Sequence, residues 1–185
     1  MEWIVLLVVV ALVVYAIWLY NDLVRKRQLV EEGWSGIDVQ LKRRTDLVPN
    51  MLETVKGYMS HERQTLEAVT NARAAAHSAQ GASPAQRAQA EGMLSAALGR
   101  LIAVAEAYPD LKANTNFLEF QDTLRSLEDE IQMARRYYNG AVRNLNVAVE
   151  SVPSNIVANM FKFEKAEYFE LDDEAERAVP DVKFS

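Results

Sequence analysis

The sequence contains no cysteine and little of the glycine and proline that interrupt secondary structure, and each of these features excludes a class of protein. Without cysteine the chain has no disulfide, thiol nucleophile, cysteine-ligated zinc or iron–sulfur cluster. Only 7 Gly and 5 Pro, together with 50% hydrophobic residues, exclude a collagen-like or wholly disordered chain of 185 residues. The formal net charge of −6 argues against a general nucleic-acid binder, which needs a basic face to neutralise phosphates.

Recognisable catalytic and metal-binding patterns are also missing. His61 and His77 are sixteen residues apart, which on one helix separates them by about 160°, so they cannot share a metal ion there. The pair His61-Glu62 begins like a metalloprotease motif, but Thr65 stands where the second histidine is required. No glycine-rich phosphate loop, nucleophile elbow or dinucleotide fingerprint occurs. We therefore expect no catalytic residues, no cofactor and no metal.

The longest apolar run lies at the N-terminus and predicts a membrane anchor. Residues Trp3 to Tyr20 contain no charge over eighteen positions, close to the length of about 20 residues that spans a bilayer core. Trp3 lies at one end and Trp18 and Tyr20 lie at the other, where aromatic side chains prefer the headgroup level. The run is preceded by Met-Glu and lacks a small-residue cleavage site, so residues 1–22 are interpreted as an uncleaved transmembrane anchor.

Basic residues near the anchor predict its orientation in the membrane. None precedes the apolar run, whereas Arg25, Lys26 and Arg27 follow it within a few residues. The positive-inside rule then puts the remainder of the chain in the cytoplasm. The same three side chains are expected to attract anionic lipid headgroups, so the lipid bilayer is a predicted partner.

Beyond the anchor the apolar residues follow helical periodicity and predict an all-α fold. We expect an elongated antiparallel bundle of three long helices and a short fourth over residues 23–163. Two stripes, which step mostly by 3, 4 or 7 residues like a coiled coil, are the most regular. They comprise Trp34, Ile37, Leu41, Val48, Leu52, Val55, Met59, Leu66 and Val69, and Phe117, Phe120, Leu124, Leu127, Ile131, Ala134, Tyr138, Val142, Leu145 and Val149.

Three features interrupt these helices, and a charged tail follows them. Pro49 lacks a backbone donor and crowds the carbonyl of Thr45, so the first long helix is expected to kink or restart there. The segment from His77 to Pro84 has the composition of a loop, and a second break is expected around Pro153. Residues 164–185 carry eight acidic and three basic side chains, which is −5 of the net charge of −6, and predict a loosely ordered acidic tail.

Polar residues run beside both stripes and suggest how two long helices keep their register. On the first helix these are Asp38, Lys42, Asp46 and Asn50, and on the third Glu128, Arg135, Asn139 and Asn146, with Arg43 and Tyr138 beside them. We expect Asp46 or Asp38 to face Arg135, and Glu128 to face a basic residue within Lys42–Arg44. The alternative is a solvated face stabilised only by weak pairs within each helix.

Two long stretches resemble signatures of the LemA family of bacterial single-pass membrane proteins. They read WSGIDVQLKRRTDLVPNMLETVKGYMSHE from Trp34 and LEDEIQMARRYYNGAVRNLNVAVESVP from Leu127, and the later FKFEKAEYFEL and VPDVKF are also similar. The resemblance implies a single N-terminal transmembrane helix and a mostly helical bundle, without an established activity. Members have been connected with membrane organisation, including magnetosome membranes, and with neighbouring genes for membrane metalloproteases and TPM-domain proteins.

The combined prediction is a membrane-anchored helical scaffold or adaptor. It would form a homo-oligomer or dock a membrane-protein partner in organising the cell envelope, without binding nucleic acid. One alternative is a sensor or ligand-binding bundle that modulates a membrane protease, with a pocket near Trp34, Tyr137 and Tyr138. An enzyme of unrecognised type is the third.

Overall fold

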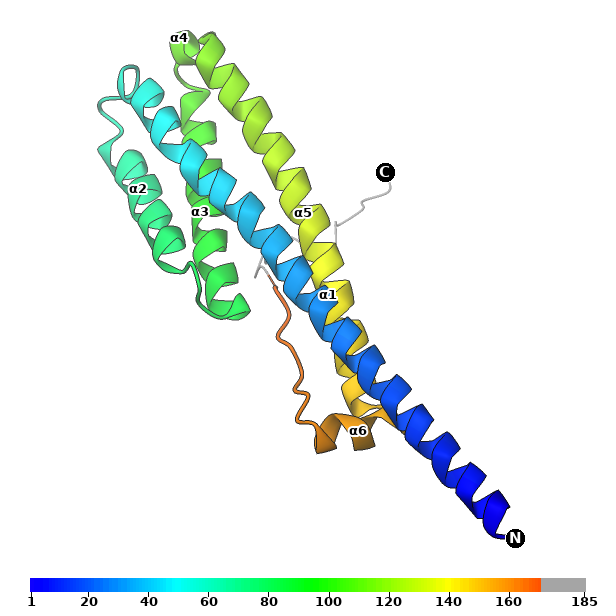
Figure 1. The fold of residues 1–185 in the computed structure, drawn as a ribbon. Helices are drawn as coiled ribbons and strands as arrows, with labels where there is room; N and C mark the ends of the chain where they lie inside the picture. Colours follow the sequence, from blue (N-terminus) through cyan, green and yellow to red (C-terminus); the bar gives the residue numbers. More distant parts are fainter. Residues whose placement is uncertain (171–185) are drawn as a thin grey trace, which may run out of the picture. The chain divides into compact units, whose positions relative to one another are not determined.

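The computed structural model describes residues 1–170, which are mostly helical and contain no strand (Figure 1). The helices are α1 (Glu2–Lys56), α2 (Arg63–Ser78), α3 (Pro84–Ala105), α4 (Pro109–Lys112), α5 (Thr115–Glu150) and α6 (Ser154–Met160). A long apolar N-terminal helix followed by a helical bundle confirms the predicted all-α class.

The anchor and the first helix of the bundle are one continuous helix. The most apolar window of eighteen residues in α1 has a mean hydropathy of 2.7, and only 6% of this window is buried within the chain. Among residues 1–170, α1 alone has the length and apolarity to cross a membrane. Because its apolar residues point outward on all sides, lipid is the environment that matches this segment.

The described chain forms two compact units, and α1 and α5 each contribute to both. Unit 1 comprises residues 1–39 and 131–168, and unit 2 comprises residues 40–130 with residues 169 and 170. In unit 1 the two long helices are antiparallel, since Gly33 lies against Tyr138 whereas Leu23 shares a core cluster with Ala148. That cluster also contains Leu19, Val157, Ala158 and Phe163, so α6 closes one end of unit 1.

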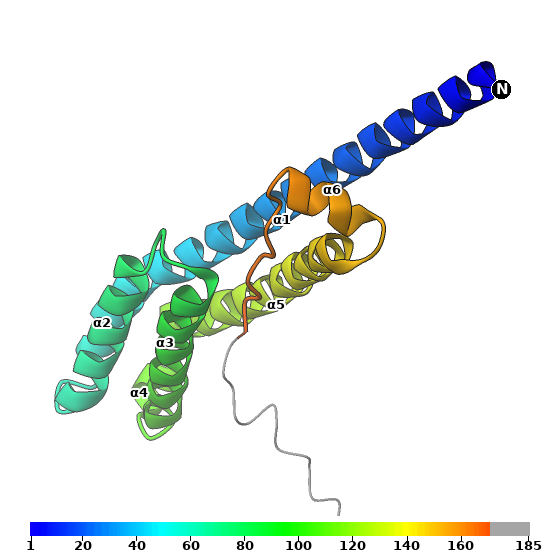
Figure 2. The ribbon, with the colours of Figure 1, turned by 90° about the horizontal axis from the view of Figure 1, so that it is seen from below.

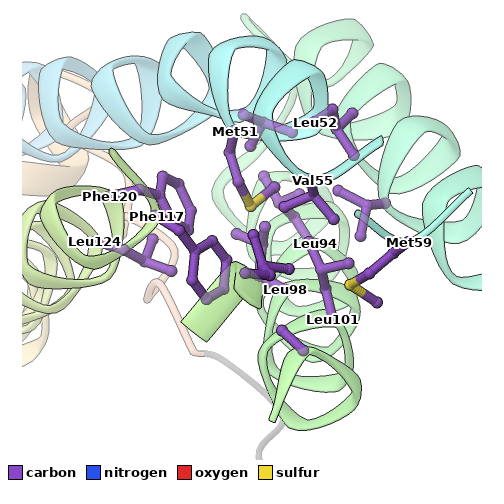
Figure 3. Packing of buried hydrophobic residues seen from close by; sticks show 14 of the residues in the cluster. Met51, Leu52, Val55, Met59, Leu94, Leu98, Leu101, Phe117, Phe120 and Leu124 are labelled. Atoms are coloured by element: carbon purple, nitrogen blue, oxygen red, sulfur yellow. The ribbon is translucent and has the colours of Figure 1, made fainter. Parts of the chain in front are cut away.

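Unit 2 has an apolar core to which α1, α2, α3, α4 and α5 all contribute. Figure 3 shows the packing of side chains within it. Helix α2 packs beside α3 (Figures 1 and 2). Most of the core side chains from α1, α2 and α5 belong to the two predicted stripes, and three leucines of α3 pack between them. The core includes Met51, Leu52, Val55, Met59, Leu94, Leu98, Leu101, Phe117, Phe120 and Leu124.

The first bundle helix is shorter than predicted, because α1 ends at Lys56 and α2 begins at Arg63. Gly57 follows the last residue of α1, and glycine in a helix interior costs about 1 kcal/mol relative to alanine. A turn over residues 57–62 lets Met59 enter the core fully. The predicted stripe continues beyond the turn. Its last residue, Val69, lies on α2 rather than on α1 and is still buried in the core.

Side-chain caps and prolines mark other helix ends. Helix α3 starts at Pro84 behind Ser83, whose hydroxyl accepts a hydrogen bond from the backbone N–H of Gln86. Helix α5 starts behind Asn114, whose side-chain oxygen accepts from the N–H of Phe117 at 3.1 Å. Helix α5 ends before Pro153, and the short α6 follows.

Pro49 lies inside α1, and the helix does not restart there. Proline removes the donor that would satisfy the carbonyl of Thr45, which is itself buried. Arg73 of α2 supplies the missing donor, because its Nε lies 3.1 Å from the Thr45 carbonyl oxygen. The helix therefore continues through proline with the freed carbonyl capped by a neighbouring helix.

The first part of the predicted acidic tail is ordered in the structure. Residues 163–170 have no regular secondary structure, yet Phe163 and Phe169 are buried. The side chain of Asn146 accepts from the N–H of Ala166 at 2.8 Å and donates to its carbonyl at 3.0 Å. This two-way pairing satisfies the backbone of an extended segment, and charge composition could not show it. Residues 171–185 of the predicted tail lie outside the described range.

A matched pair of glycine substitutions tests the packing of unit 1. A Cβ on Gly33 would lie 3.1 Å from the Cα of Tyr138 and 3.2 Å from Cδ1 of Tyr137, whereas Gly36 has nothing within 4 Å. We expect Gly33→Ala to destabilise the protein by about 1–3 kcal/mol through overpacking. Gly36→Ala should instead stabilise it by about 0.5–1 kcal/mol through helix propensity. Thermal unfolding in mild detergent, followed by circular dichroism, measures the change in both variants. Equal changes in melting temperature would contradict the close packing of Gly33 against Tyr138.

A double-mutant cycle tests the interaction between Arg73 and the carbonyl that Pro49 frees. Arg73→Ala should cost about 1–3 kcal/mol in the natural chain, because a buried carbonyl loses its donor. In a Pro49→Ala background the new backbone N–H can bond to Thr45, so the same substitution should cost much less. Denaturant unfolding of the four proteins gives the coupling energy. A coupling energy of zero would show that Arg73 acts elsewhere.

Candidate functional site

A buried guanidinium lies at the centre of unit 2. Arg44 of α1 donates from Nη2 to Glu91 of α3, at 2.6 Å from the carboxylate oxygen Oε2 and 3.1 Å from the backbone carbonyl. Its Nη1 donates to Ser95 of α3 at 2.7 Å and to Glu128 of α5 at 2.6 Å. One side chain therefore holds three helices through four hydrogen bonds.

A second arginine extends this group to the fourth helix. Arg87 of α3 lies one turn before Glu91, and its Nη2 is 3.1 Å from Glu91 Oε1. Its Nη1 donates to the carbonyl of Ala76 at 2.7 Å, in the last turn of α2 where carbonyls lack intrahelical partners. We call Arg44, Arg87, Glu91 and Glu128 the ion cluster.

The ion cluster is almost completely buried from solvent, and this burial determines how it contributes to stability. Arg44 and Arg87 are each 1% exposed and Glu91 is 0% exposed, whereas Glu128 is half-buried. Desolvating such charges cancels much of their mutual attraction, so the cluster adds little net stability over an apolar core. Removing one member is different, because it leaves the opposite charge buried without its partner. The cluster therefore selects one arrangement of the four helices.

The sequence predicted part of this arrangement and missed its centre. Glu128 accepts from Arg44, which lies within the segment predicted to face it, and Arg43 forms a surface pair with Glu130 at 3.6 Å. Glu91 and Arg87 were not singled out, although a signal exists. The stripe of α3 through Leu94, Leu98 and Leu101, extended backwards by steps of 3 and 4, reaches these two charged residues. The stripe of α1 likewise has a gap between Leu41 and Val48. Arg44 and Thr45 occupy the positions in this gap where the helical repeat would place apolar residues.

Other residues of the predicted polar lines have separate surroundings. Asp38, Arg135 and Asn139 are partly buried, and the expected contact of Arg135 with Asp38 or Asp46 stays a prediction. Lys42 is exposed. Asp46 and Asn50 line an open groove between α1 and α5 in unit 2, with two adjoining cavities of about 700 and 340 Å³. Its other lining residues include Arg43, Leu47, Asp122, Thr123, Ser126 and Glu130.

Trp34 and Tyr138 pack against each other in unit 1. The rings of Trp34 and Tyr138 lie 5.4 Å apart, and the Tyr138 hydroxyl donates to the carbonyl of Glu167 at 2.8 Å. Burial, together with the negative charge of Glu167, raises the pKa of Tyr138 to about 12. The hydroxyl therefore stays a donor at physiological pH. With Asn146 it holds the C-terminal segment of unit 1 against α5.

The anchor residues have the exposure that lipid contact requires. Trp3, Trp18 and Tyr20 are exposed on α1. Beyond them, Arg25 is exposed, Lys26 pairs with Asp22, and Arg27 lies 3.9 Å from Glu31 and 5.3 Å from the ring centre of Phe163. Within residues 1–170, His61 and His77 are exposed, and no group of three or more His, Asp or Glu residues is placed to hold a metal ion.

Replacing the central arginine tests the ion cluster. Arg44→Ala should destabilise the protein by about 3–5 kcal/mol, because Ser95 and Glu128 lose their donor and the buried Glu91 keeps only Arg87 as a charged partner. The neighbouring Arg43→Ala removes only an exposed pair and should change stability by no more than about 0.5 kcal/mol. Denaturant unfolding in detergent measures both. The triple variant Arg44→Leu, Arg87→Leu and Glu91→Leu leaves no buried charge without a partner and should recover much of the loss. Equal costs for Arg44→Ala and Arg43→Ala would refute the cluster.

Comparison with known proteins agrees with this architecture. Residues 33–184 match the model of the LemA family. Two magnetosome proteins of Paramagnetospirillum magneticum, MamQ 1 and MamQ 2, are each 25% identical over 88% of this chain and 68% of their own length. Protein LemA of Metamycoplasma hominis is 26% identical over 88% of this chain and 73% of its own length. The matched region contains the ion cluster, all of α5 and the part of α1 from residue 33 onward, and the chain belongs to the LemA family.

Proposed function

We propose that this membrane-associated helical protein is a scaffold that docks a second copy of itself or a membrane-protein partner through one face of α5. The coarse part of this statement follows from the apolar N-terminal helix and from membership of the LemA family. The docking role is supported by an apolar face that the packing of unit 1 leaves uncovered.

That face lies on the part of α5 that belongs to unit 1. Met133, Tyr137 and Val147 are exposed, and with Gly140 and Asn144 they step by 4, 3, 4 and 3 residues along one side of the helix. Gly140 has nothing within 4 Å of a Cβ, so a partner backbone can approach closely. The ring of Tyr137 reaches over Gly33 and extends the surface onto α1. We call these residues the α5 face.

The location of the scaffold follows from its basic residues. With Arg25, Lys26 and Arg27 after the anchor and no basic residue before it, the proposal places the bundle on the cytoplasmic side of the inner membrane. The relatives named MamQ are magnetosome proteins, which supports a role in organising membranes. No reaction chemistry is needed for such a role.

A ligand-binding sensor is the second candidate, and the groove of unit 2 is the observation that favours it. The groove has the volume of a small-molecule site, and polar side chains from two helices converge on it. Its polar residues include Asp46 and Asn50 of α1 and Thr123 of α5. In this reading a bound metabolite would alter how the bundle engages a membrane protease.

Site-specific crosslinking tests the docking role of the α5 face. Since the chain has no cysteine, Met133→Cys introduces a single reactive thiol. Met93 of α3 provides a matched control, because it is 50% exposed while Met133 is 54% exposed. In native membranes treated with a short bifunctional maleimide or a thiol-to-amine crosslinker, we expect Met133→Cys to give one discrete larger product and Met93→Cys to give none.

The size of the product identifies the partner. Twice the monomer mass indicates a second copy, and another defined mass indicates a different membrane protein. A Met133→Cys chain that stays monomeric, in membranes and by native mass in nanodiscs, would contradict the scaffold. A small molecule retained on that monomer under native mass spectrometry would favour the sensor.

A further inference from the structure

Helix α6 packs against the end of the apolar stretch of α1. Leu19 and Leu23, at the end of the apolar stretch of α1, are buried against Val157 and Ala158 of α6. Next to them the ring of Tyr20 lies 4.8 Å from that of Phe161. Trp18 and Tyr20 belong to the aromatic belt of the anchor, which sits at the headgroup level of a membrane. A helix packed on the same turns must share that level.

The two faces of α6 differ in what covers them. Val157 and Ala158 face the core of unit 1, whereas Ile156 and Met160, four residues apart, project from the opposite side. Ile156 is 60% exposed, Met160 70% and the adjoining Phe161 55%. Val152, just before α6, is exposed as well. This apolar group is continuous with the anchor, because Phe161 touches Tyr20.

The turn that ends α6 fixes which aromatic side chain points outward. Lys162 has a left-handed backbone conformation, with φ = 56°. The N–H of Phe163 donates to the carbonyl of Ala158 at 2.9 Å, and the N–H of Lys162 donates to the carbonyl of Asn159. These two bonds with a left-handed residue form a Schellman motif. The motif directs Phe163 into the core and leaves Phe161 outside. The exposed Lys162 adds a positive charge beside this apolar group, which suits the headgroups of anionic lipids.

We propose that residues 152–162 form a second membrane contact, in which α6 inserts Ile156, Met160 and Phe161 into the bilayer interface beside the transmembrane anchor. Figure 1 shows α6 running across α1 rather than along it, as a helix lying in the membrane plane requires. The occupant of this apolar surface is thus the lipid interface. This contact is independent of the α5 face, and either can fail without the other.

Depth-dependent quenching in the full-length protein tests this contact. Single cysteines at Ile156, Val10 and Asn144 carry an environment-sensitive fluorophore in vesicles of phosphatidylcholine and phosphatidylglycerol. The vesicles contain lipids spin-labelled at either a shallow or a deep acyl position. Ile156→Cys should be quenched several-fold more by the shallow label, at a depth of about 5–10 Å below the headgroups. Val10→Cys, in the anchor, should respond most to the deep label, and Asn144→Cys, exposed on α5, to neither.

Two results would overturn the proposal, and they differ in meaning. A fluorophore at Ile156 that is unquenched and reports water would leave α6 outside the bilayer. One that is unquenched but reports an apolar environment would mean that protein, such as a second copy, covers this surface. Met160→Cys repeats the measurement on the same side of α6, so a local effect of one substitution cannot decide the outcome.

Discussion

The arrangement of unit 2 depends on the burial of one guanidinium. Arg44 can be stable in a dry core only if Glu91, Ser95 and Glu128 all lie within hydrogen-bond distance of it. Apolar stripes with a heptad-like repeat tolerate a slip of seven residues, or about 10 Å along a helix. Such a slip would keep leucines in contact with leucines but would separate Arg44 from both carboxylates. The ion cluster therefore removes alternatives that the apolar core alone would allow.

Much of the fold was predictable because it depends on local periodicity. The stripe from Phe117 to Val149 appears as one helix, α5, which Asn114 caps at its N-terminus. The anchor was equally clear, since length and apolarity are properties of a single segment. Both inferences use only residues that are neighbours along the chain. Neither depends on knowing what lies opposite a side chain.

The features that sequence reasoning missed are those that depend on a distant partner. Pro49 predicts an orphaned carbonyl on Thr45, but only the fold shows that Arg73 reaches it. Residues 163–170 look like the start of a charged tail, yet Asn146 pairs with the backbone of Ala166. The charged pair Arg87 and Glu91 on an apolar stripe had a local signal, although its meaning required Arg44 on another helix.

The way the anchor enters unit 1 constrains what the protein can do at a membrane. A domain on a flexible linker can reorient freely above the bilayer and can search a large volume for partners. Here α1 continues without interruption, and the core of unit 1 already covers Leu19 and Leu23 in the last turns of the apolar stretch. No length of free chain therefore separates the membrane from unit 1. The continuous helix holds the surfaces of unit 1, including the α5 face, at a fixed distance from the end of the apolar stretch, so the partner proposed for this face would have to present its own surface at that distance.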